Sequence, residues 1–219
     1  MKTTDVAAST VLHVGWAGPA AAQAYSEACL SEADRMRAGG ARRGKAELDW
    51  RVSRALMAEL DVASAGVWSL SHSGGHALCA RAAGGKLGVD LERIKPRDVL
   101  RLAQWVCDPA ECEILHGQAA ALQLTYFYLL WTLKEAFVKA AGLEFPGAMR
   151  DVGLREEAGE QRLRAPAGKW HAAVFLLEPD WMAAIVTSAG GGGPLPVVAW
   201  QSGQIARVPV HRMLGSWSC

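Results

Sequence analysis

The chain has 219 residues, of which 51% are hydrophobic and 21% are charged. This composition is that of an ordinary globular protein, which excludes extensive disorder and predicts a sizeable core. The 23 Lys and Arg residues nearly balance the 22 Asp and Glu residues, so the overall charge favours neither a nucleic acid nor a membrane as partner.

The cysteines and the apolar segments indicate the compartment. The five cysteines contain no Cys-x-x-Cys pair, so we expect neither a disulfide framework nor a structural zinc site, and predict reduced thiols in the cytoplasm. Residues 1–16 lack the apolar core of a signal peptide. The longest apolar run, AAALQLTYFYLLWTL, is shorter than the roughly 20 residues that cross a bilayer, so a soluble protein is expected.

The first elements predicted along the chain are a helix, a hairpin and a strand. Residues 42–60 carry apolar side chains at a spacing of three to four, which predicts an amphipathic helix. The runs GVWSLSH and HALCARA flank a turn at Ser73-Gly74-Gly75 and predict a hairpin. The next run, KLGVDLERI, alternates as a strand does, so that Asp90 and Glu92 share one face.

Three helices and a second hairpin are expected further on. KPRDVLRLAQWV predicts a helix, and DPAECEIL starts another, with Asp108 as N-cap and Glu111 at N3. A third helix contains Trp131, with Thr125 as its expected cap and Gly142 as its end. WHAAVFLLEPDWMAAIVTSA predicts a hairpin around Glu178-Pro179-Asp180, and residues 190–196 a flexible loop.

The order of these elements repeats. The helix at 42–60 and the hairpin at 68–82 correspond to the helix at 126–141 and the hairpin at 170–187. This pattern predicts an α+β fold of two similar halves, residues 1–88 and 89–219, with a cleft between them.

Two sets of acidic residues are candidates for chemistry. Asp90 and Glu92 project from one face of a strand, where a solvated face is the alternative explanation. Glu135 lies four residues after Trp131 and four before Lys139, so the three side chains form one stripe on a helix. A surface ion pair between Glu135 and Lys139 is the alternative here.

The segment SLSHSGGH adds a candidate binding turn. His72 stands between two serines, an arrangement that also occurs in an ordinary hydrogen-bonded loop. His72 and His76 have a spacing that binds zinc on a helix, but Gly74-Gly75 disfavour a helix. The Gly-x-Ser-x-Gly pattern of a serine hydrolase is absent from this segment.

Together these residues indicate metal-assisted phosphate chemistry. Asp90, Glu92 and Glu135 form an all-oxygen set that suits Mg²⁺, which binds few carboxylates when a substrate supplies phosphate oxygens. His72 and Lys139 are suited to holding those phosphates. The residues alone do not name the substrate, and hydrolysis of a pyrophosphate fits them as well.

Three segments, in order, resemble the signature motifs of the 4′-phosphopantetheinyl transferases. They are SLSHSGG, GVDLERIK and WTLKEAFVKAAG, and WVCDPAECEIL is similar to the family's segment between the last two. The resemblance is to the long, monomeric type that activates surfactin synthetase, and it covers residues 51–142. It implies a pseudo-dimer of two α+β halves with the active site between them.

The resemblance also implies a reaction and the residues that perform it. The reaction moves 4′-phosphopantetheine from coenzyme A to a serine of an apo acyl or peptidyl carrier protein, and releases adenosine 3′,5′-bisphosphate. Lys139 falls on the lysine that contacts the pyrophosphate, and His72 lies near the 3′-phosphate. The magnesium ligands implied are Asp90, Glu92 and Glu135, and the loop that contacts the coenzyme A nucleotide is Ser71, His72, Ser73 and Gly74.

A serine hydroxyl needs a base, and Glu135 is the candidate, directly or through a water on the metal. Lys134 points roughly 100° away from it on the helix, so a structural ion pair is the alternative to a catalytic role. The carrier protein is expected to be acidic and helical, and to dock near Lys95, Arg97 and the helix from Thr125.

One family segment is missing from this chain. The family carries a Gly-Lys-Pro segment on the adenine side before its Ser-His-Ser motif, whereas only DVASAGVW lies between Leu60 and Ser69 here. A non-catalytic relative that binds coenzyme A or a carrier protein is therefore the second hypothesis. The three carboxylates and Lys139 favour the enzyme, because a binding module has no use for a metal set.

Overall fold

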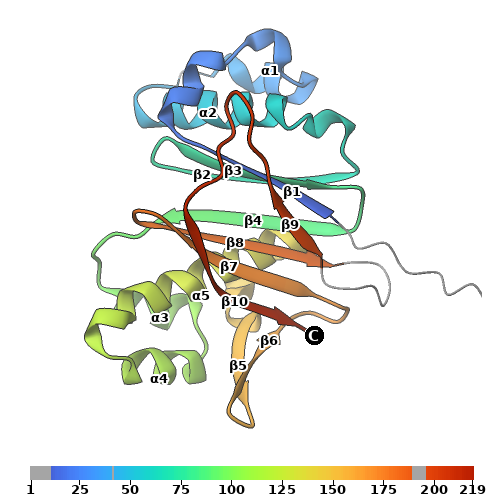
Figure 1. Cartoon of the computed structure of the whole chain (residues 1–219). Helices are drawn as coiled ribbons and strands as arrows, with labels where there is room; N and C mark the ends of the chain where they lie inside the picture. Colours follow the sequence, from blue (N-terminus) through green and yellow to red (C-terminus); the bar gives the residue numbers. More distant parts are fainter. Residues whose placement is uncertain (1–10, 41, 189–195) are drawn as a thin grey trace, which may run out of the picture.

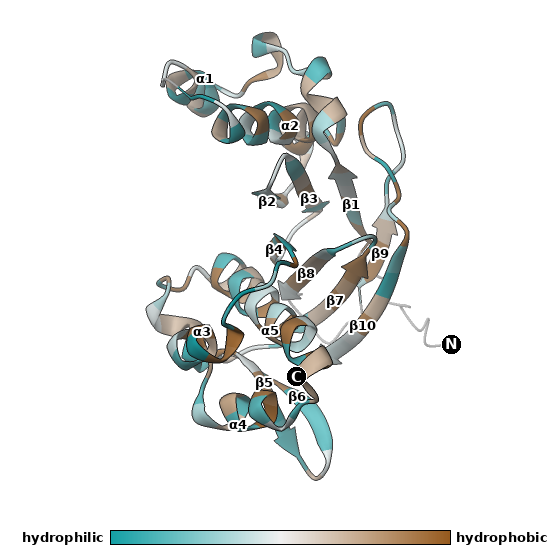
Figure 2. Ribbon diagram, turned by 90° about the vertical axis from the view of Figure 1, so that its left-hand side faces the viewer, coloured by the Kyte–Doolittle hydropathy of each residue, from teal (hydrophilic) through white to brown (hydrophobic). Residues whose placement is uncertain are grey.

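The computed structural model describes residues 11–40, 42–188 and 196–219. Two four-stranded sheets lie face to face, and each carries one long helix on its outer side (Figure 1). Helix α2 (Lys45–Glu59) covers the first sheet, and α5 (Ala120–Ala141) covers the second. Figure 2 shows the resulting layers, from α2 through the two sheets to α5. The expected α+β fold of two similar halves is confirmed.

The first sheet has the strand order β2-β3-β1-β9. The hairpin of β2 (Val67–Ser73) and β3 (His76–Ala82) is closed by Gly74 and Gly75, which both have positive φ angles. Strand β1 (Val11–Ala17) pairs antiparallel with β3, and β9 (Val197–Trp200) pairs parallel with β1. The predicted hairpin is confirmed, and two strands are added to it that the sequence did not indicate.

The second sheet has the order β10-β7-β8-β4 and is antiparallel throughout. It contains the predicted strand β4 (Lys86–Arg93) and the predicted hairpin of β7 (His171–Leu177) and β8 (Trp181–Ser188). Strand β10 (His211–Ser218) adds an edge from the C-terminal segment.

The remaining elements lie around these two layers. Helix α1 (Glu32–Ala38) precedes α2, and helices α3 (Val99–Val106) and α4 (Pro109–Gly117) connect β4 to α5. A separate hairpin, β5 (Gly153–Glu157) and β6 (Glu160–Arg164), follows α5. The elements also include four short 3-10 helices: η1 (Pro19–Ala24), η2 (Glu27–Cys29), η3 (Val62–Ser64) and η4 (Gly147–Asp151).

The core consists of three clusters of buried side chains. One lies between the two sheets and includes Leu78, Val89 and Ile185. The others lie under the long helices, around Leu56 beneath α2 and around Phe137 beneath α5. Because β4 belongs to the second sheet but faces the first, its side chains reach both halves.

Helix boundaries confirm some local signals and overturn one. Asp108 and Glu111 form the predicted capping box of α4, and Gly142 ends α5 in the left-handed conformation. The prediction that Thr125 caps the helix with Trp131 is wrong, because α5 begins at Ala120 after an N-cap residue that makes no side-chain bond.

Two predictions about segments stay open. Residues 190–195 of the expected flexible loop lie outside the described part of the chain. The division into residues 1–88 and 89–219 stays a prediction; β4 runs across residue 88, and β9, from the second range, pairs with β1, from the first.

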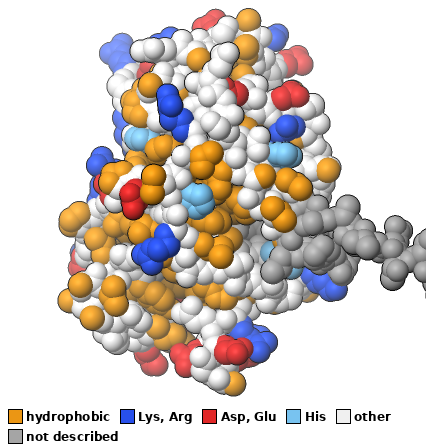
Figure 3. Space-filling model, viewed as in Figure 1, with side chains coloured by type: hydrophobic (Ala, Val, Ile, Leu, Met, Phe, Trp, Pro, Cys, Tyr) orange, Lys and Arg blue, Asp and Glu red, His pale blue; other side chains and the backbone are white. Residues whose placement is uncertain are grey.

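The surface, the cysteines and the helices complete the description of the fold. Figure 3 shows hydrophobic side chains gathered over the middle of the face seen in Figure 1, with most charged side chains toward its ends. All five cysteines are free thiols, as expected. Among the described residues, no helix is both long and apolar enough to span a membrane.

Candidate active site

The two sheets meet along a seam, which we define as residues 69–73 of β2 facing residues 89–92 of β4. Three serine hydroxyls of β2 face β4, because alternate side chains of a strand point to one side. The Ser69 hydroxyl accepts a hydrogen bond from the Val89 amide at 3.0 Å. Ser71 donates to Asp90 Oδ1 at 2.9 Å, and Ser73 donates to Glu92 Oε2 at 3.4 Å. The serines thus orient both carboxylates from the opposite half.

Ser71 and His72 lie in the predicted strand run, whereas Ser73, which was expected in the turn, is the last residue of β2. All three lie in β2, and only Gly74 lies in the turn that follows. Because strand side chains alternate, Ser71 and Ser73 face the carboxylates while His72 faces the opposite side, toward α2.

Helix α5 supplies the other half of the site. Every residue from Trp131 to Ala140 is buried except Trp131, Glu135 and Lys139, which form the predicted stripe. Lys139 Nζ lies 2.7 Å from Asp90 Oδ1, donates to the Val89 carbonyl at 3.1 Å and lies 3.9 Å from Glu135 Oε2. The helix therefore brings Glu135 and Lys139 to the strand that carries Asp90 and Glu92.

The carboxylates perturb one another. Burial, followed by the charge of nearby Asp90, raises the pKa of Glu135 to about 7, while Lys139 opposes the rise. Burial, again followed by Asp90, also raises the pKa of Glu92. Such an arrangement of like charges is typical of sites that bind cations or move protons.

One buried carboxylate oxygen among Asp90, Glu92 and Glu135 is available to bind a cation. Asp90 is 2% exposed, and its Oδ2 is buried without a hydrogen-bond partner. Within the described residues, no group of three or more His, Cys, Asp or Glu side chains is arranged to hold a metal by itself. Mg²⁺, however, binds through one or two carboxylates together with substrate phosphates, so a closed protein set is not required. The unpaired oxygen and the all-oxygen chemistry fit Mg²⁺.

His72 is held by a residue that the sequence did not single out. Its Nδ1 lies 4.0 Å from Asp49 Oδ2, and its side chain is 48% exposed. Asp49 is 7% exposed, and its Oδ1 accepts a hydrogen bond from the Gly75 amide at 2.5 Å. Burial lowers the pKa of His72, and the Asp49 carboxylate opposes this. His76 packs instead against Trp16 and Trp181, with ring centroids 5.3 Å and 4.3 Å away.

Asp49→Ala is expected to destabilise the protein by about 1–3 kcal/mol, because the buried Gly75 amide loses its acceptor. Asp49→Asn retains an acceptor oxygen and should cost less. Urea unfolding of the two variants measures the difference. Equal losses for Ala and Asn would show that the charge of Asp49, not its hydrogen bond to the turn, stabilises this region.

Sequence reasoning missed the role of Asp49, and it missed that Glu111 pairs with Lys134 in addition to capping α4. Asp49 lies on the buried face of α2, where a carboxylate among apolar positions was an available signal. Glu111 was predicted as part of a cap, but it also lies 2.7 Å from Lys134 Nζ. The structural ion pair considered for Lys134 is therefore confirmed.

The fold and the site define an α+β protein with an acidic, lysine-paired centre at the seam between two halves. Residues 86–186, which include β4, α5 and β8, match the family described as the 4′-phosphopantetheinyl transferase superfamily. Over 123 residues the chain is 33% identical to the 4′-phosphopantetheinyl transferase psf-1 of Bacillus pumilus, covering 55% of this chain and 52% of that one. Over 101 residues it is 35% identical to Sfp of Bacillus subtilis (strain 168), covering 45% and 44%.

The matched part of the chain is similar to the 4′-phosphopantetheinyl transferase superfamily, the family that the motifs resemble. It spans about half the length of curated relatives such as these. A solved structure, the holo-(acyl-carrier-protein) synthase of Bacillus anthracis in complex with CoA, matches with a TM-score of 0.41 and 15% identity, over 48% of this chain and 96% of that one.

Proposed function

We propose that the protein transfers 4′-phosphopantetheine from coenzyme A to a serine of an apo carrier protein. The observation that carries this proposal is the meeting of Asp90, Glu92, Glu135 and Lys139 at the seam, from two elements far apart in sequence. The alternative, a surface ion pair between Glu135 and Lys139, would leave the pKa of Glu135 near its ordinary value. Burial and the charges of Asp90 and Glu92 instead raise this pKa to about 7.

Glu135 is the general base of the proposed reaction. As the serine oxygen forms a bond to the β-phosphorus, its proton passes to the Glu135 carboxylate. The bond between that phosphorus and the bridging oxygen breaks, and adenosine 3′,5′-bisphosphate leaves. Glu135 takes this proton directly or through a water, because its side chain is only half-buried and lies beside Lys139 at the open side of α5.

Cationic groups hold the substrate on either side of the base. Lys139 is 32% exposed, so its ammonium can turn from Asp90 to the negative charge that develops on the leaving phosphate. His72 is half-exposed on the other face of β2; burial lowers its pKa and the Asp49 carboxylate opposes this, so a phosphate that approaches the ring would favour its charged form and suit it to the 3′-phosphate.

Asp90, Glu92 and Glu135 would hold Mg²⁺ in this proposal. When bound, Mg²⁺ offsets the charge of the pyrophosphate and polarises its phosphoryl oxygens. The hydroxyls of Ser71 and Ser73 donate hydrogen bonds to Asp90 and Glu92 and so orient these two carboxylates. Lys139 also donates a hydrogen bond to Asp90.

The binding of Mg²⁺ is expected to strengthen as pH rises through about 7. Without metal, the pKa of Glu135 is about 7 in the folded protein and about 4.3 in the unfolded chain, so folding favours the protonated carboxyl. The stability that this protonated form contributes is lost as pH rises through 7, where the carboxyl loses its proton. Mg²⁺ then replaces the proton. Calorimetric titration should show affinity rising roughly tenfold per pH unit below 7 and levelling above it. Affinity independent of pH would remove Glu135 from the metal set.

The structure has a cavity near the position where the family carries its Gly-Lys-Pro segment. A cavity of about 340 Å³ lies beside the short connection from α2 to β2, and Trp68, on the same face of β2 as His72, lines it. Arg54 and Met57 of α2 form another wall. This space supports binding of a nucleotide without the segment, which both the enzyme and the non-catalytic relative require.

The proposed partner is an acyl or peptidyl carrier protein, with coenzyme A as co-substrate. The docking surface lies around Lys95, Arg97 and the first turns of α5, where the Arg97 guanidinium stands 5.4 Å from the Tyr128 ring centroid. We expect a monomer that works in the cytoplasm, where the free thiols remain reduced.

One assay tests the proposed function. The protein is incubated with coenzyme A, Mg²⁺ and an apo carrier protein, and the carrier is weighed by mass spectrometry. A gain of one phosphopantetheine supports the transferase. Binding of coenzyme A without any gain supports the non-catalytic relative, and hydrolysis of the pyrophosphate without transfer supports a hydrolase.

A further inference from the structure

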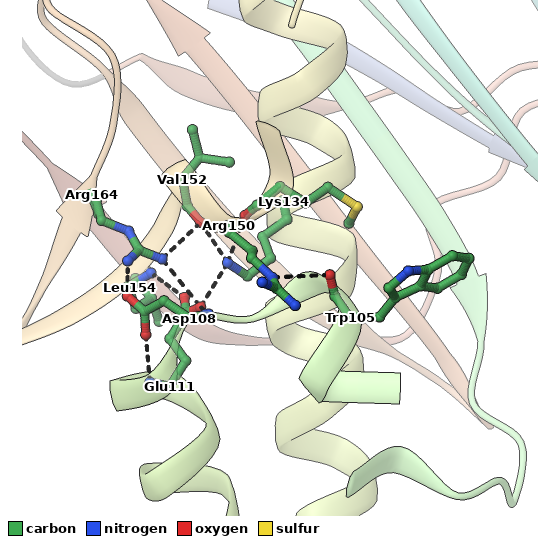
Figure 4. A network of polar contacts seen from close by, with 9 residues as sticks. Trp105, Asp108, Glu111, Lys134, Arg150, Val152, Leu154 and Arg164 are labelled. Carbon is green, nitrogen blue, oxygen red and sulfur yellow. Dashed lines mark hydrogen bonds and ion pairs between the residues drawn. The ribbon is translucent and has the colours of Figure 1, made fainter. Parts of the chain in front are cut away.

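A network of buried charges lies next to Glu135 in the chain but outside the site (Figure 4). At its centre is Lys134, which is fully buried. Its ammonium donates to the carbonyl oxygens of Met149 and Val152 at 2.9 Å and 2.5 Å, and lies 2.7 Å from Glu111 Oε2. Buried lysines are rare, and this one is fully paired.

Glu111 completes the network with partners from four segments. It is 1% exposed; Oε1 accepts a hydrogen bond from the Leu154 amide at 3.1 Å, and Oε2 accepts one from the Asp108 amide at 3.0 Å. Arg164 lies 3.2 Å from Oε2 and also pairs with Asp108. The network therefore ties α4, α5, η4 and the β5–β6 hairpin together.

The packing around Gly153, at the centre of this network, leaves no room for a side chain. Gly153 has a φ angle of 135°, which L side chains rarely adopt. A Cβ atom there would collide with Glu111 Oε1 and lie 2.8 Å from Lys134 Nζ. The network is thus closely fitted on the side of α5 that faces away from the first sheet.

Helix α5 is anchored on two sides, and Glu135 lies between them. Successive helical residues are about 100° apart, so Glu135 follows Lys134 by 100° on the helix and precedes Ala136 by 100°. The Ala136–Ala140 side rests directly on β4, where Gly88 approaches the Ala140 amide so closely that an added Cβ would lie 2.6 Å from it. The network holds the Lys134 side.

We propose that the Lys134–Glu111 pair is a positioning device for Glu135, which fixes the rotation of α5 about its axis. This inference rests on the proposed function. A rotation of about 10° moves a side-chain end, some 6 Å from the axis, by about 1 Å. A displacement of about 1 Å in a catalytic group can lower the rate roughly 10²-fold.

Because Lys134 and Glu111 carry opposite charges, both charges can be removed together, and this makes it possible to test positioning apart from stability. A buried ion pair is often replaceable by neutral groups without loss of stability, whereas removal of one partner leaves an unpaired charge. The double variant Lys134→Met/Glu111→Gln removes both charges and keeps a side-chain oxygen that can accept from the Leu154 amide. It should fold, but the ionic contacts that tie α5 to α4, η4 and the β5–β6 hairpin are lost.

The test compares this double variant with the native protein and with Arg162→Met/Glu160→Gln, which removes an exposed ion pair in the β6 strand of the same region. We expect the double variant to lose roughly 10- to 100-fold in kcat, with a smaller change in the KM for coenzyme A, because Lys139 moves with α5 whereas the turn at Gly74 and His72 is untouched. Its affinity for Mn²⁺, used as a probe for Mg²⁺, should also fall. The exposed-pair variant should match the native protein.

Native kcat and Mn²⁺ affinity in a folded double variant would overturn the proposal. Should that variant fail to fold, Glu111→Gln alone keeps the two carbonyl acceptors of Lys134, and unchanged kcat there overturns it equally. If the native protein transfers nothing yet binds Mn²⁺, the proposed function fails, while the comparison of Mn²⁺ affinities still tests positioning. A native protein that neither transfers nor binds Mn²⁺ removes both.

Discussion

Replacement of Glu135 by Gln is expected to slow phosphopantetheine transfer roughly 10²- to 10⁴-fold, the usual contribution of a positioned base. Gln has the shape of Glu, so it can occupy the same half-buried position between Asp90 and Lys139. It cannot accept the serine proton, however, and it brings no charge to a cation. Steady-state transfer, followed by the mass of the carrier protein, measures the loss.

The variant should remain folded, which distinguishes lost chemistry from lost structure. At pH 8 the ionised Glu135 carboxylate is disfavoured by burial and by Asp90, so Gln should not lower the melting temperature of the metal-free protein. Glu113→Gln on the exposed side of α4 is the matched control and should retain native turnover. Unchanged turnover in Glu135→Gln would assign the base role to another group.

The elements that the sequence predicted share a local signal. The β2–β3 hairpin needs two residues with positive φ, and Gly74-Gly75 supply them. Helix α4 begins where Asp108 and Glu111 cap one another. In both cases the residues that decide the structure are neighbours in the chain, so their interaction is visible before folding.

Strands β9 and β10 lacked such a signal. β9 has four residues and pairs in parallel with β1, more than 180 residues away in the chain. β10 is largely exposed and contains a bulge between Met213 and Gly215. Short or exposed edge strands are defined by their partners rather than by their own alternation, so they become visible only in the folded sheet.

The same distinction applies to the site. The spacing of Asp90 and Glu92 on a strand, and of Glu135 and Lys139 on a helix, predicted that each pair shares a face. That the pairs meet was expected from the chemistry of their oxygen atoms and from the resemblance to a family, not from any local spacing in the chain. The roles of Asp49 and Glu111 depend on the Gly75 amide and on Lys134, which are brought close by tertiary packing.

Gly88→Ala is expected to destabilise the protein by about 3 kcal/mol, at the upper end of the range for overpacking. Gly88 is buried in the middle of β4, where α5 crosses the strand. An added Cβ would collide with the Ala136 carbonyl oxygen and lie 2.6 Å from the Ala140 amide nitrogen. Both are helix backbone atoms that cannot rotate away, so α5 as a whole must shift.

That shift reaches the site, because Lys139 and Asp90 lie on either side of the same contact, 2.7 Å apart. Gly88→Ala should therefore lower both the melting temperature, by roughly 6–12 °C, and the transfer rate at temperatures where it is still folded. Gly84→Ala is the control, since a Cβ there meets nothing within 4 Å. Equal melting temperatures for the two variants would mean that α5 does not set the distance between the lysine and the carboxylate.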